Sequence, residues 1–583
     1  MNNFTLKPVA LAVGLMLAAP AFAAGIDFSG SNIYMKFLDG DQRTTSPASG
    51  DTASGADQGQ WTEFELRMKV NISKQVEAGV RLQSRSPASY WTNFGFNNNE
   101  GFSDPSGIHP EQSKYVKLRG AYVLLTPGYN WLDQALIGSS DWGMFDPFTV
   151  GQVRYIDRDN YNGLYFKGKL PLAGSSWEFG RLSLPHYLGA NWGNKPPDCA
   201  PCADDSTQYN EAVYIAQAKA QFGPVRLATS YQWFDDHQLK PDTTPNNGQD
   251  IETFAKSRVF MLKGEGSAMD GVDLKGAYYY SQWKSQLFIP DWGNSPKSDV
   301  NDHAFKFDLA LTSLPVSGLT FNYQYFDIGA GFYSNTAARR ESDVLLTEGS
   351  EAAWFNWGQS IWLGGAAKDY QQAPVKSLAD NNYMDFDEAP AEGVNGWKGH
   401  TFLLNWEVAK VPMSFEYSRI GYNYNWQNYS PTGPLVGYFG ANNDRHTDLF
   451  VAKVAYVVPV AGGIELSAKY KMVDDSNKGQ TANATDDRDT KDSGYTLSAG
   501  NQLFGDLFGK FAYGRYKRDI TKSSSPKLEN DKSITSLGFA YNLAGFEAGL
   551  LAQWISGDGD PGETGNRVDI KQYRMKAFLK AIF

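Results

Sequence analysis

Basic side chains at alternate positions are the residues of this sequence best suited to chemistry. Arg67 and Lys69, for example, flank Met68. Successive side chains of a β-strand point to opposite faces, so these bases share one face of each predicted strand. If that face lines a water-filled lumen, the bases attract anions and lower the barrier to their passage. The candidate lumen bases are Arg67, Lys69, Arg81, Arg85, Lys117, Arg119, Lys167, Lys169, Arg226, Lys469, Lys471, Arg574 and Lys576.

The charge balance of that face differs from the balance of the whole chain. The chain has a net charge of −11, which argues against a nucleic-acid partner. On the predicted lumen face, bases outnumber acids roughly two to one, so the surplus acid lies mainly in the loops. A second interpretation is that the bases pair with acids across the lumen and hold water without ion selectivity.

Two further motifs have weaker chemical meaning. Cys199 and Cys202 form a CAPC stretch without the following His of a haem attachment site, and we predict a small loop disulfide for an exported protein. Asp558, Asp560 and Glu563 could hold a structural calcium ion, although a solvated tight loop has the same composition. We find no catalytic constellation and expect no other cofactor, so the chain is predicted not to be an enzyme.

The elements that position the bases are strands of about ten residues. The hairpin Trp61–Ser73 and Val76–Arg85 alternates apolar and charged positions, and the pattern recurs from Ile26–Leu38 to the last residue. Short turns alternate with long polar loops. This arrangement predicts an all-β fold, a transmembrane antiparallel barrel of about 22 strands (range 18–24) with long extracellular loops and short periplasmic turns.

The first 23 residues predict a cleaved signal peptide, with a basic start, an apolar run and a small-residue cleavage site. Residues 24–583 are predicted to form the barrel as one domain. No later apolar run is long enough for a membrane helix.

Aromatic residues near the predicted strand ends suggest girdles at the membrane interfaces. These are Trp61, Trp131, Trp233, Trp283 and Trp554. The last strand ends in Phe583, which resembles the C-terminal signature that the barrel-assembly machinery recognises in outer-membrane barrels. We therefore expect the bacterial outer membrane as the location, both termini in the periplasm, and outer-membrane lipid and lipopolysaccharide as surroundings.

The long loop at residues 329–399 is the predicted constriction. A barrel of this width would leave an open channel, so an inward loop is expected to narrow it. Its aromatic and basic residues suit such a role, although the same residues also suit an outward lid or adhesive surface. The candidates are Arg339, Arg340, Trp354, Trp357 and Trp362.

Two stretches carry a family resemblance. The sequence ALIGSSDWGMFDPFTVGQVRYIDRDNYNGLYFKG from Ala135, and QWISGDGDPGETGNR near the C-terminus, resemble the corresponding segments of alginate-export-type barrels. That family implies about eighteen strands and passive export of an acidic polysaccharide. Our predicted function is a porin for passive diffusion of small anionic solutes or acidic saccharides. The alternatives are an exopolysaccharide export barrel and a surface adhesin or receptor.

Overall fold

In a computed structural model, the described residues form strands, turns and bends. The residues that it describes are 27–45, 59–87, 117–140, 142–150, 161–172, 174–183, 212–235, 252–289, 293–294, 298–329, 332, 397–422, 444–460, 462–478, 488–523, 525–559 and 567–583. Within these ranges, no helix has the length and apolarity of a membrane span. Residues 1–23 lie outside them, so the signal peptide stays a prediction.

The described strands all belong to one sheet. They are β1 (Asn32–Thr45), β2 (Gly59–Ser73), β3 (Val76–Pro87), β4 (Lys117–Leu125), β5 (Gln134–Ser140), β6 (Tyr161–Lys169), β7 (Ser176–Ser183), β8 (Ala212–Phe222), β9 (Val225–Asp235), β10 (Glu252–Met269), β11 (Val272–Ile289), β12 (Gly293–Asn294), β13 (Ser298–Leu311), β14 (Leu319–Ile328), β15 (Trp397–Val408), β16 (Val411–Tyr422), β17 (Asp444–Val458), β18 (Ile464–Lys478), β19 (Arg488–Phe504), β20 (Leu507–Lys522), β21 (Ser525–Leu543), β22 (Phe546–Gly559) and β23 (Val568–Ile582).

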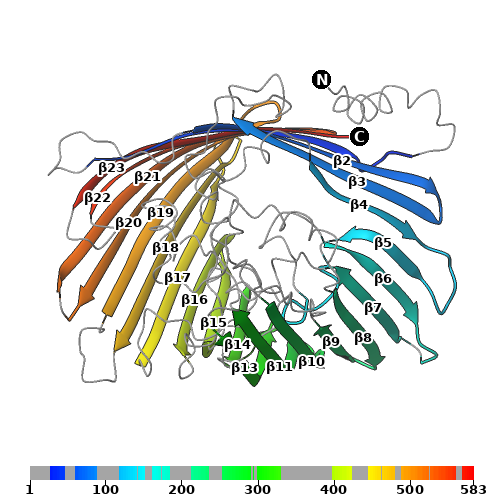
Figure 1. The fold of residues 1–583 in the computed structure, drawn as a ribbon. Helices are drawn as coiled ribbons and strands as arrows, with labels where there is room; N and C mark the ends of the chain where they lie inside the picture. The colour runs from blue at the N-terminus through cyan, green and yellow to red at the C-terminus, as the bar shows by residue number, and fades with distance from the viewer. Residues whose placement is uncertain are drawn as a thin grey trace.

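The sheet closes on itself as an antiparallel barrel (Figure 1). Strands that follow one another in the sequence pair with one another, and β1 also pairs with β23 over Asn32–Thr45. The two-residue β12 pairs only with β11, so 22 strands form the closed wall. The predicted all-β antiparallel barrel of about 22 strands is confirmed.

The two ends of the barrel differ in their connections. Tight turns join β2 to β3, β8 to β9 and β10 to β11, and Gly223 and Gly271 adopt the positive φ that these turns require (57° and 75°). These three turns lie at one end, which we call the short-turn end, and both β1 and β23 meet it. The opposite end carries the longer connections, together with one tight turn between Lys522 of β20 and Ser525 of β21, and is called the long-loop end.

The outer face of the wall is apolar and aromatic. Tyr231, Tyr278, Tyr495 and Trp554 remain 39–51% exposed on this face, as expected for side chains that meet lipid and its interface. Trp233 lies on the same face and stacks on Tyr214, with ring centroids 5.1 Å apart. These residues form part of a girdle.

One predicted girdle residue lies elsewhere. Trp283 is only 4% exposed and packs in a cluster on the inner face with Val213 and Phe234, so its girdle assignment is wrong. Alternation in β11 places Trp283 on the same face as Tyr279. An apolar side chain on the inner wall cannot be distinguished from a lipid-facing one by residue type alone.

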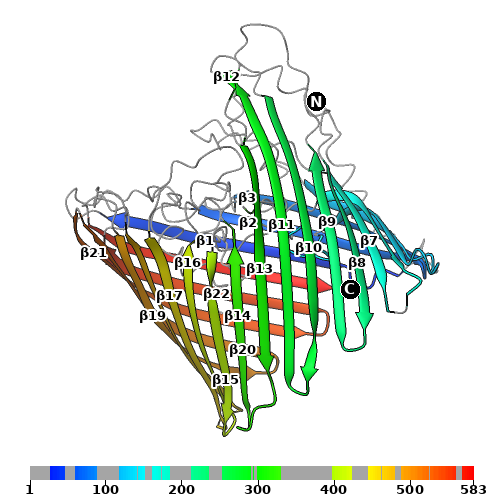
Figure 2. The same cartoon turned by 90° about the horizontal axis from the view of Figure 1, so that it is seen from below.

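Several strands are much longer than the ten residues predicted. β10 and β11 each have 18 residues and β21 has 19, and β10 and β11 extend beyond their neighbours in Figure 2. Beyond the girdle, both faces of β20 and β21 are polar, so the alternation that marks a half-buried strand disappears. Cross-strand ion pairs hold this part together, including Lys527 with Asp519 at 3.2 Å and Arg515 with Asp531 at 3.1 Å.

The first strand begins later than predicted, at Asn32 instead of Ile26. Gly30, with φ of 89°, places a turn before it. Asp27 caps that turn by accepting hydrogen bonds from the Ser29 backbone N–H and Oγ, both at 2.8 Å, and from Asn71 Nδ2 at 3.0 Å. These bonds, led by that of the Ser29 backbone, lower the pKa of the Asp27 carboxyl.

The closure of the barrel predicts a specific covalent link. Met35 on β1 and Leu579 on β23 are register partners on the outer face. Met35→Cys with Leu579→Cys should be joined by a short bis-alkylating reagent in the folded protein, and the linked chain should then run with altered mobility after boiling. Met35→Cys with Leu274→Cys, whose second position lies on β11, is the matched control. Equal linking of both pairs would contradict the β1–β23 seam.

Candidate functional site

A segment of the β5–β6 connection packs against one face of the wall. Trp142, Phe145, Phe148 and Val150 are each at most 4% exposed, and the aromatic girdle lies on the opposite face. This segment, residues 142–150, is called the inner segment. Its position identifies the inner face of every strand, because strand register carries the alternation around the barrel.

The inner segment is shaped by local hydrogen bonds around Asp146. The Asp146 carbonyl accepts from the backbone N–H groups of Thr149 (2.9 Å) and Val150 (3.0 Å), and its carboxylate accepts from the Phe148 N–H (3.0 Å). The Asp146 carboxylate also lies 3.6 Å from Lys263 Nζ on β10. This compact turn presents apolar side chains to the wall.

Glycines on β6 and β7 make room for the first rings of the inner segment. A Cβ at Gly163 would lie 2.7 Å from the Trp142 ring, and a Cβ at Gly180 would lie 2.9 Å from the Phe145 ring. Phe145 also packs edge-on against Tyr165, with centroids 5.9 Å apart. The wall therefore has a recess that larger residues would fill.

The far end of the inner segment is held by an aromatic cluster on β11 and beyond. Phe148 stacks on Tyr279 at 5.0 Å and lies 5.9 Å from Phe332. Lys306 Nζ lies 5.3 Å from the centroid of the Phe148 ring, within reach of a cation–π interaction. The inner segment thus lines the lumen from β6 to β14 and narrows it.

This constricting element was missed by the sequence analysis, which assigned the role to residues 329–399. The candidates Arg339, Arg340, Trp354, Trp357 and Trp362 lie outside the described residues, so their role stays a prediction. Phe332, from the same connection, is fully buried against the inner segment. The available signal was the aromatic run WGMFDPF between two glycine-containing strands.

The inner wall at β2–β4 is polar and ion-paired. Glu65 is 5% exposed and binds both Arg67 and Arg81, the latter at 2.8 Å. Glu77 binds Lys69 at 2.9 Å and accepts a hydrogen bond of 2.7 Å from the Tyr122 hydroxyl. In this sector the described lumen bases Arg67, Lys69 and Arg81 lie beside two acids, Glu65 and Glu77.

Tyr122 follows a break in the alternation of β4. A register shift between Arg81 and Leu82 shows a β-bulge in the β3–β4 pairing, which places Arg119 as the extra residue of β4. The bulge breaks the period-two alternation, so Tyr122 faces the polar cluster around Glu77. No pattern in the sequence marks this bulge.

The inner wall at β17–β21 is rich in lysine. These residues, called the lysine strip, are Lys453, Lys469, Lys471, Lys510 and Lys532. Lys471 is fully buried and Lys532 is 1% exposed, with its ammonium 5.7 Å from the centroid of the Tyr516 ring. Only Lys469 and Lys471 belong to our sequence-based site set.

A buried ion pair lies beside the lysine strip. Arg518 donates two hydrogen bonds to Asp492, from Nε at 2.7 Å and from Nη2 at 2.6 Å. The two side chains are 9% and 6% exposed. Such bidentate geometry holds β19 and β20 together from the lumen side.

The other predicted lumen bases have mixed positions. Lys167 and Lys169 share the inner face of β6 with Tyr165, and Arg226 binds Glu265 at 3.2 Å. The side chains outside the described set are those of Arg85, Lys117, Arg119, Arg574 and Lys576. The role of the whole set in solute passage stays a prediction.

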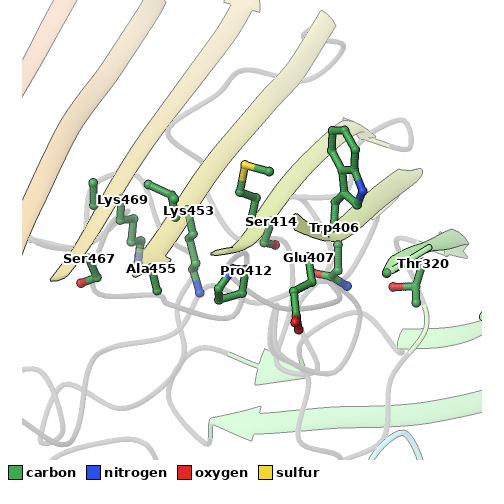
Figure 3. A pocket seen from close by; sticks show the side chains of 14 residues that line it. Thr320, Trp406, Glu407, Pro412, Ser414, Lys453, Ala455, Ser467 and Lys469 are labelled. Atoms are coloured by element: carbon green, nitrogen blue, oxygen red, sulfur yellow. The ribbon is translucent and has the colours of Figure 1, made fainter. Parts of the chain in front are cut away.

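A groove opens at the short-turn end of β14–β18 (Figure 3). Its volume is about 560 Å³, and its lining includes Thr320, Asn405, Ser414, Lys453 and Lys469. In Figure 3 the lysine side chains and Glu407 point to one side of the strands and Trp406 to the other.

The predicted disulfide and calcium site are not tested. Cys199 and Cys202 lie outside the described residues, as do Asp560 and Glu563. Asp558 forms an ion pair with Arg567. Among the described residues, no group of three or more His, Cys, Asp or Glu is placed to hold a metal ion.

The anchoring of the inner segment can be tested with Phe148→Ala. The loss of its contacts with Tyr279 and Phe332 should cost about 3 kcal/mol of stability and release the segment. Single-channel conductance should therefore rise. Phe260→Ala, on the outer face, is the matched control and should leave conductance as it is. An unchanged conductance in Phe148→Ala would show that the inner segment does not limit the pore.

We expect substitutions in the buried pair of Asp492 and Arg518 to lower the free energy of unfolding by a large and non-additive amount. Arg518→Met leaves the Asp492 carboxylate buried without its bidentate partner, at a cost of about 3–5 kcal/mol. Adding Asp492→Leu should recover most of that loss, as measured by the urea dependence of unfolding in detergent or lipid. Additive losses in the double variant would exclude a direct coupling of these two side chains.

Comparison with known proteins gives one family match. Residues 410–577 match the Gram-negative porin family. No curated protein sequence matches the chain at a significant level. The resemblance to alginate-export-type barrels is not tested by these comparisons.

Among solved structures, the chain aligns with several proteins at low identity. For ferric citrate transporter FecA in the unliganded form, the identity is 8%, the coverage is 95% of this chain and 79% of that chain, and the TM-score is 0.44. For OccAB4 of Acinetobacter baumannii, the identity is 9%, the coverage is 96% of this chain and 99% of that chain, and the TM-score is 0.32. For OpdQ of Pseudomonas aeruginosa, the identity is 9%, the coverage is 95% of this chain and 97% of that chain, and the TM-score is 0.31.

The fold and the family match agree on the class of protein. Strands that close without an edge, an apolar aromatic outer face and a charged inner wall are the features of a barrel that spans a bilayer. The porin-family match covers β16 to β22 and part of β23. The closed 22-strand barrel is consistent with an outer-membrane β-barrel porin, and residues 410–577 are similar to the Gram-negative porin family.

Proposed function

We propose that this protein is a water-filled pore for passive diffusion, with small anions or acidic saccharides as its favoured solutes. The lysine strip is the observation that carries this proposal. Five lysines line the inner face of β17–β21, and two of them are at most 1% exposed. Cations fixed at a wall of low polarisability act on a passing charge more strongly than cations in bulk water.

The other parts of the inner wall differ in their chemistry from the lysine strip. At β2–β4 and at β7–β8 the bases lie beside acids, as in the pair of Lys219 and Glu178 at 2.9 Å. The electric fields of the two opposite charges in such a pair largely cancel at a distance. The opposite sector carries the buried rings of the inner segment. A solute with an apolar face and an acid group, such as a sugar acid, suits a lumen that is apolar on one side and basic on the other.

The orientation follows from the asymmetry of the ends. We infer that the short-turn end and both termini face the periplasm, because outer-membrane barrels have short periplasmic turns. We also infer that the last strand, which ends at Phe583, is what the barrel-assembly machinery binds, and that lipopolysaccharide and lipid cover the outer face. Passive diffusion needs no cofactor and no chemical step.

Anion preference should depend on the lysine strip. In planar bilayers with a salt gradient, the reversal potential of the wild-type protein should show anion preference. Replacing Lys471, Lys510 and Lys532 with glutamine should reduce it. The preference should also fall between 0.1 and 1 M salt, where the Debye length drops from about 10 to about 3 Å.

The control for this experiment removes the same charge from the outer face. Lys491, Lys517 and Lys527 lie on the outward side of β19–β21 and pair there with acids. Replacing these three with glutamine should leave the reversal potential as it is. Cation preference in the wild-type protein would refute the proposal.

Deletion of residues 342–393 distinguishes two interpretations of this connection, a second constriction of the lumen and an outward lid. If that connection narrows the lumen, as its aromatic and basic composition predicts, its removal should raise single-channel conductance and relax ion selectivity. Conductance is measured on the same preparation, with heat-modifiable gel migration as the folding control. Unchanged conductance together with lost surface binding would favour the adhesin interpretation.

A further inference from the structure

We propose that the groove at the short-turn end of β14–β18 is a binding site for the carboxylate of an acidic saccharide, with Lys453 and Lys469 as its cationic donors. This inference rests on the proposed function and adds a defined site to it. A site here would hold the solute at the end of its path, on the side that we assign to the periplasm.

The strand register brings the two lysines together. Lys453 on β17 and Lys469 on β18 are direct partners, so their Cβ atoms lie about 5 Å apart on the inner face. Both side chains are half-buried. Two ammonium groups this close raise the positive potential at this point of the wall, which attracts an anion. A single carboxylate has the two oxygens needed to meet both.

The same register row continues as uncharged hydrogen-bonding groups. Lys453 is opposite Ser414, Ser414 is opposite Asn405, and Asn405 is opposite Thr320. The row therefore offers hydroxyl and amide groups next to the cation pair, across three further strands. These groups can both donate to and accept from the hydroxyls of a sugar ring.

The volume and the charges of the groove indicate which class of ligand it can bind. A volume of about 560 Å³ lies in the range of small-molecule sites and suits a mono- or disaccharide. Glu407 lines the same groove, close to the end that carries Thr320. Its carboxylate accepts hydrogen bonds from sugar hydroxyls. The arrangement favours a ligand with an acid group at the lysines and hydroxyls toward Glu407.

The test is a direct binding measurement on the purified full-length protein in detergent. Disodium digalacturonate, titrated at low salt in a calorimeter, should bind to the wild-type protein, and maltose, the neutral disaccharide probe, should not. Lys453→Met with Lys469→Met should weaken digalacturonate binding at least tenfold. Heat-modifiable migration shows whether each variant is folded.

The matched control removes two cations from the outer face. Lys284→Gln with Lys398→Gln changes the net charge by the same amount and should leave the binding constant unchanged. Equal binding by the Lys453/Lys469 variant and the wild type would overturn the site, as would equal binding of maltose. A variant that does not fold is replaced by Lys453→Gln alone, for which at least a threefold loss is expected and an unchanged constant would overturn the site.

The outcomes for the site and for the proposed function are separable. Channel recordings test the anion pore without reference to the groove. Digalacturonate binding that is lost in the Lys453/Lys469 variant, in a protein that shows no anion preference, would support the site and reject the proposed function. Anion preference in a protein that does not bind digalacturonate would reject the site alone.

Discussion

Backbone hydrogen bonding in lipid is the constraint on which this structure depends. A strand edge inside a bilayer has no water to satisfy its N–H and C=O groups, so the sheet must close. The pairing of β1 with β23 over fourteen residues provides that closure. Once the wall is closed, side-chain alternation assigns each residue to lipid or lumen, and a single bulge, as in β4, moves residues from one side to the other.

The lumen is then divided by what packs against the wall. From β6 to β14, aromatic side chains of the inner segment bury an apolar wall, with Gly163 and Gly180 recessed to admit the rings. From β17 to β21, the wall carries the lysine strip and the buried pair of Asp492 and Arg518. This division gives a wide barrel two chemically different sides, and a solute that passes through it meets both.

The number of strands, their antiparallel order and the all-β class could be predicted from the sequence, because period-two alternation survives wherever one face meets lipid. Strand ends in β19–β21 could not, because both faces are polar there and the ion pair of Lys527 with Asp519 joins residues on different strands. The inner segment was missed for a related reason: Trp142 and Phe148 look like exposed loop aromatics until the wall that buries them is known. Trp283 was misplaced because an inner apolar cluster and a lipid face select the same residue types.

The unequal length of the strands affects how ions reach the narrow part of the pore. A strand of 18 residues extends about 60 Å, whereas the apolar band of a barrel is about 25 Å tall. Part of the wall therefore stands as a stiff collar in water, beyond the bilayer. The collar encloses the pore mouth on one side, whereas the side of the short strands β5–β7 stays open to the surrounding water. Ions therefore reach the narrowest point mainly through the open side.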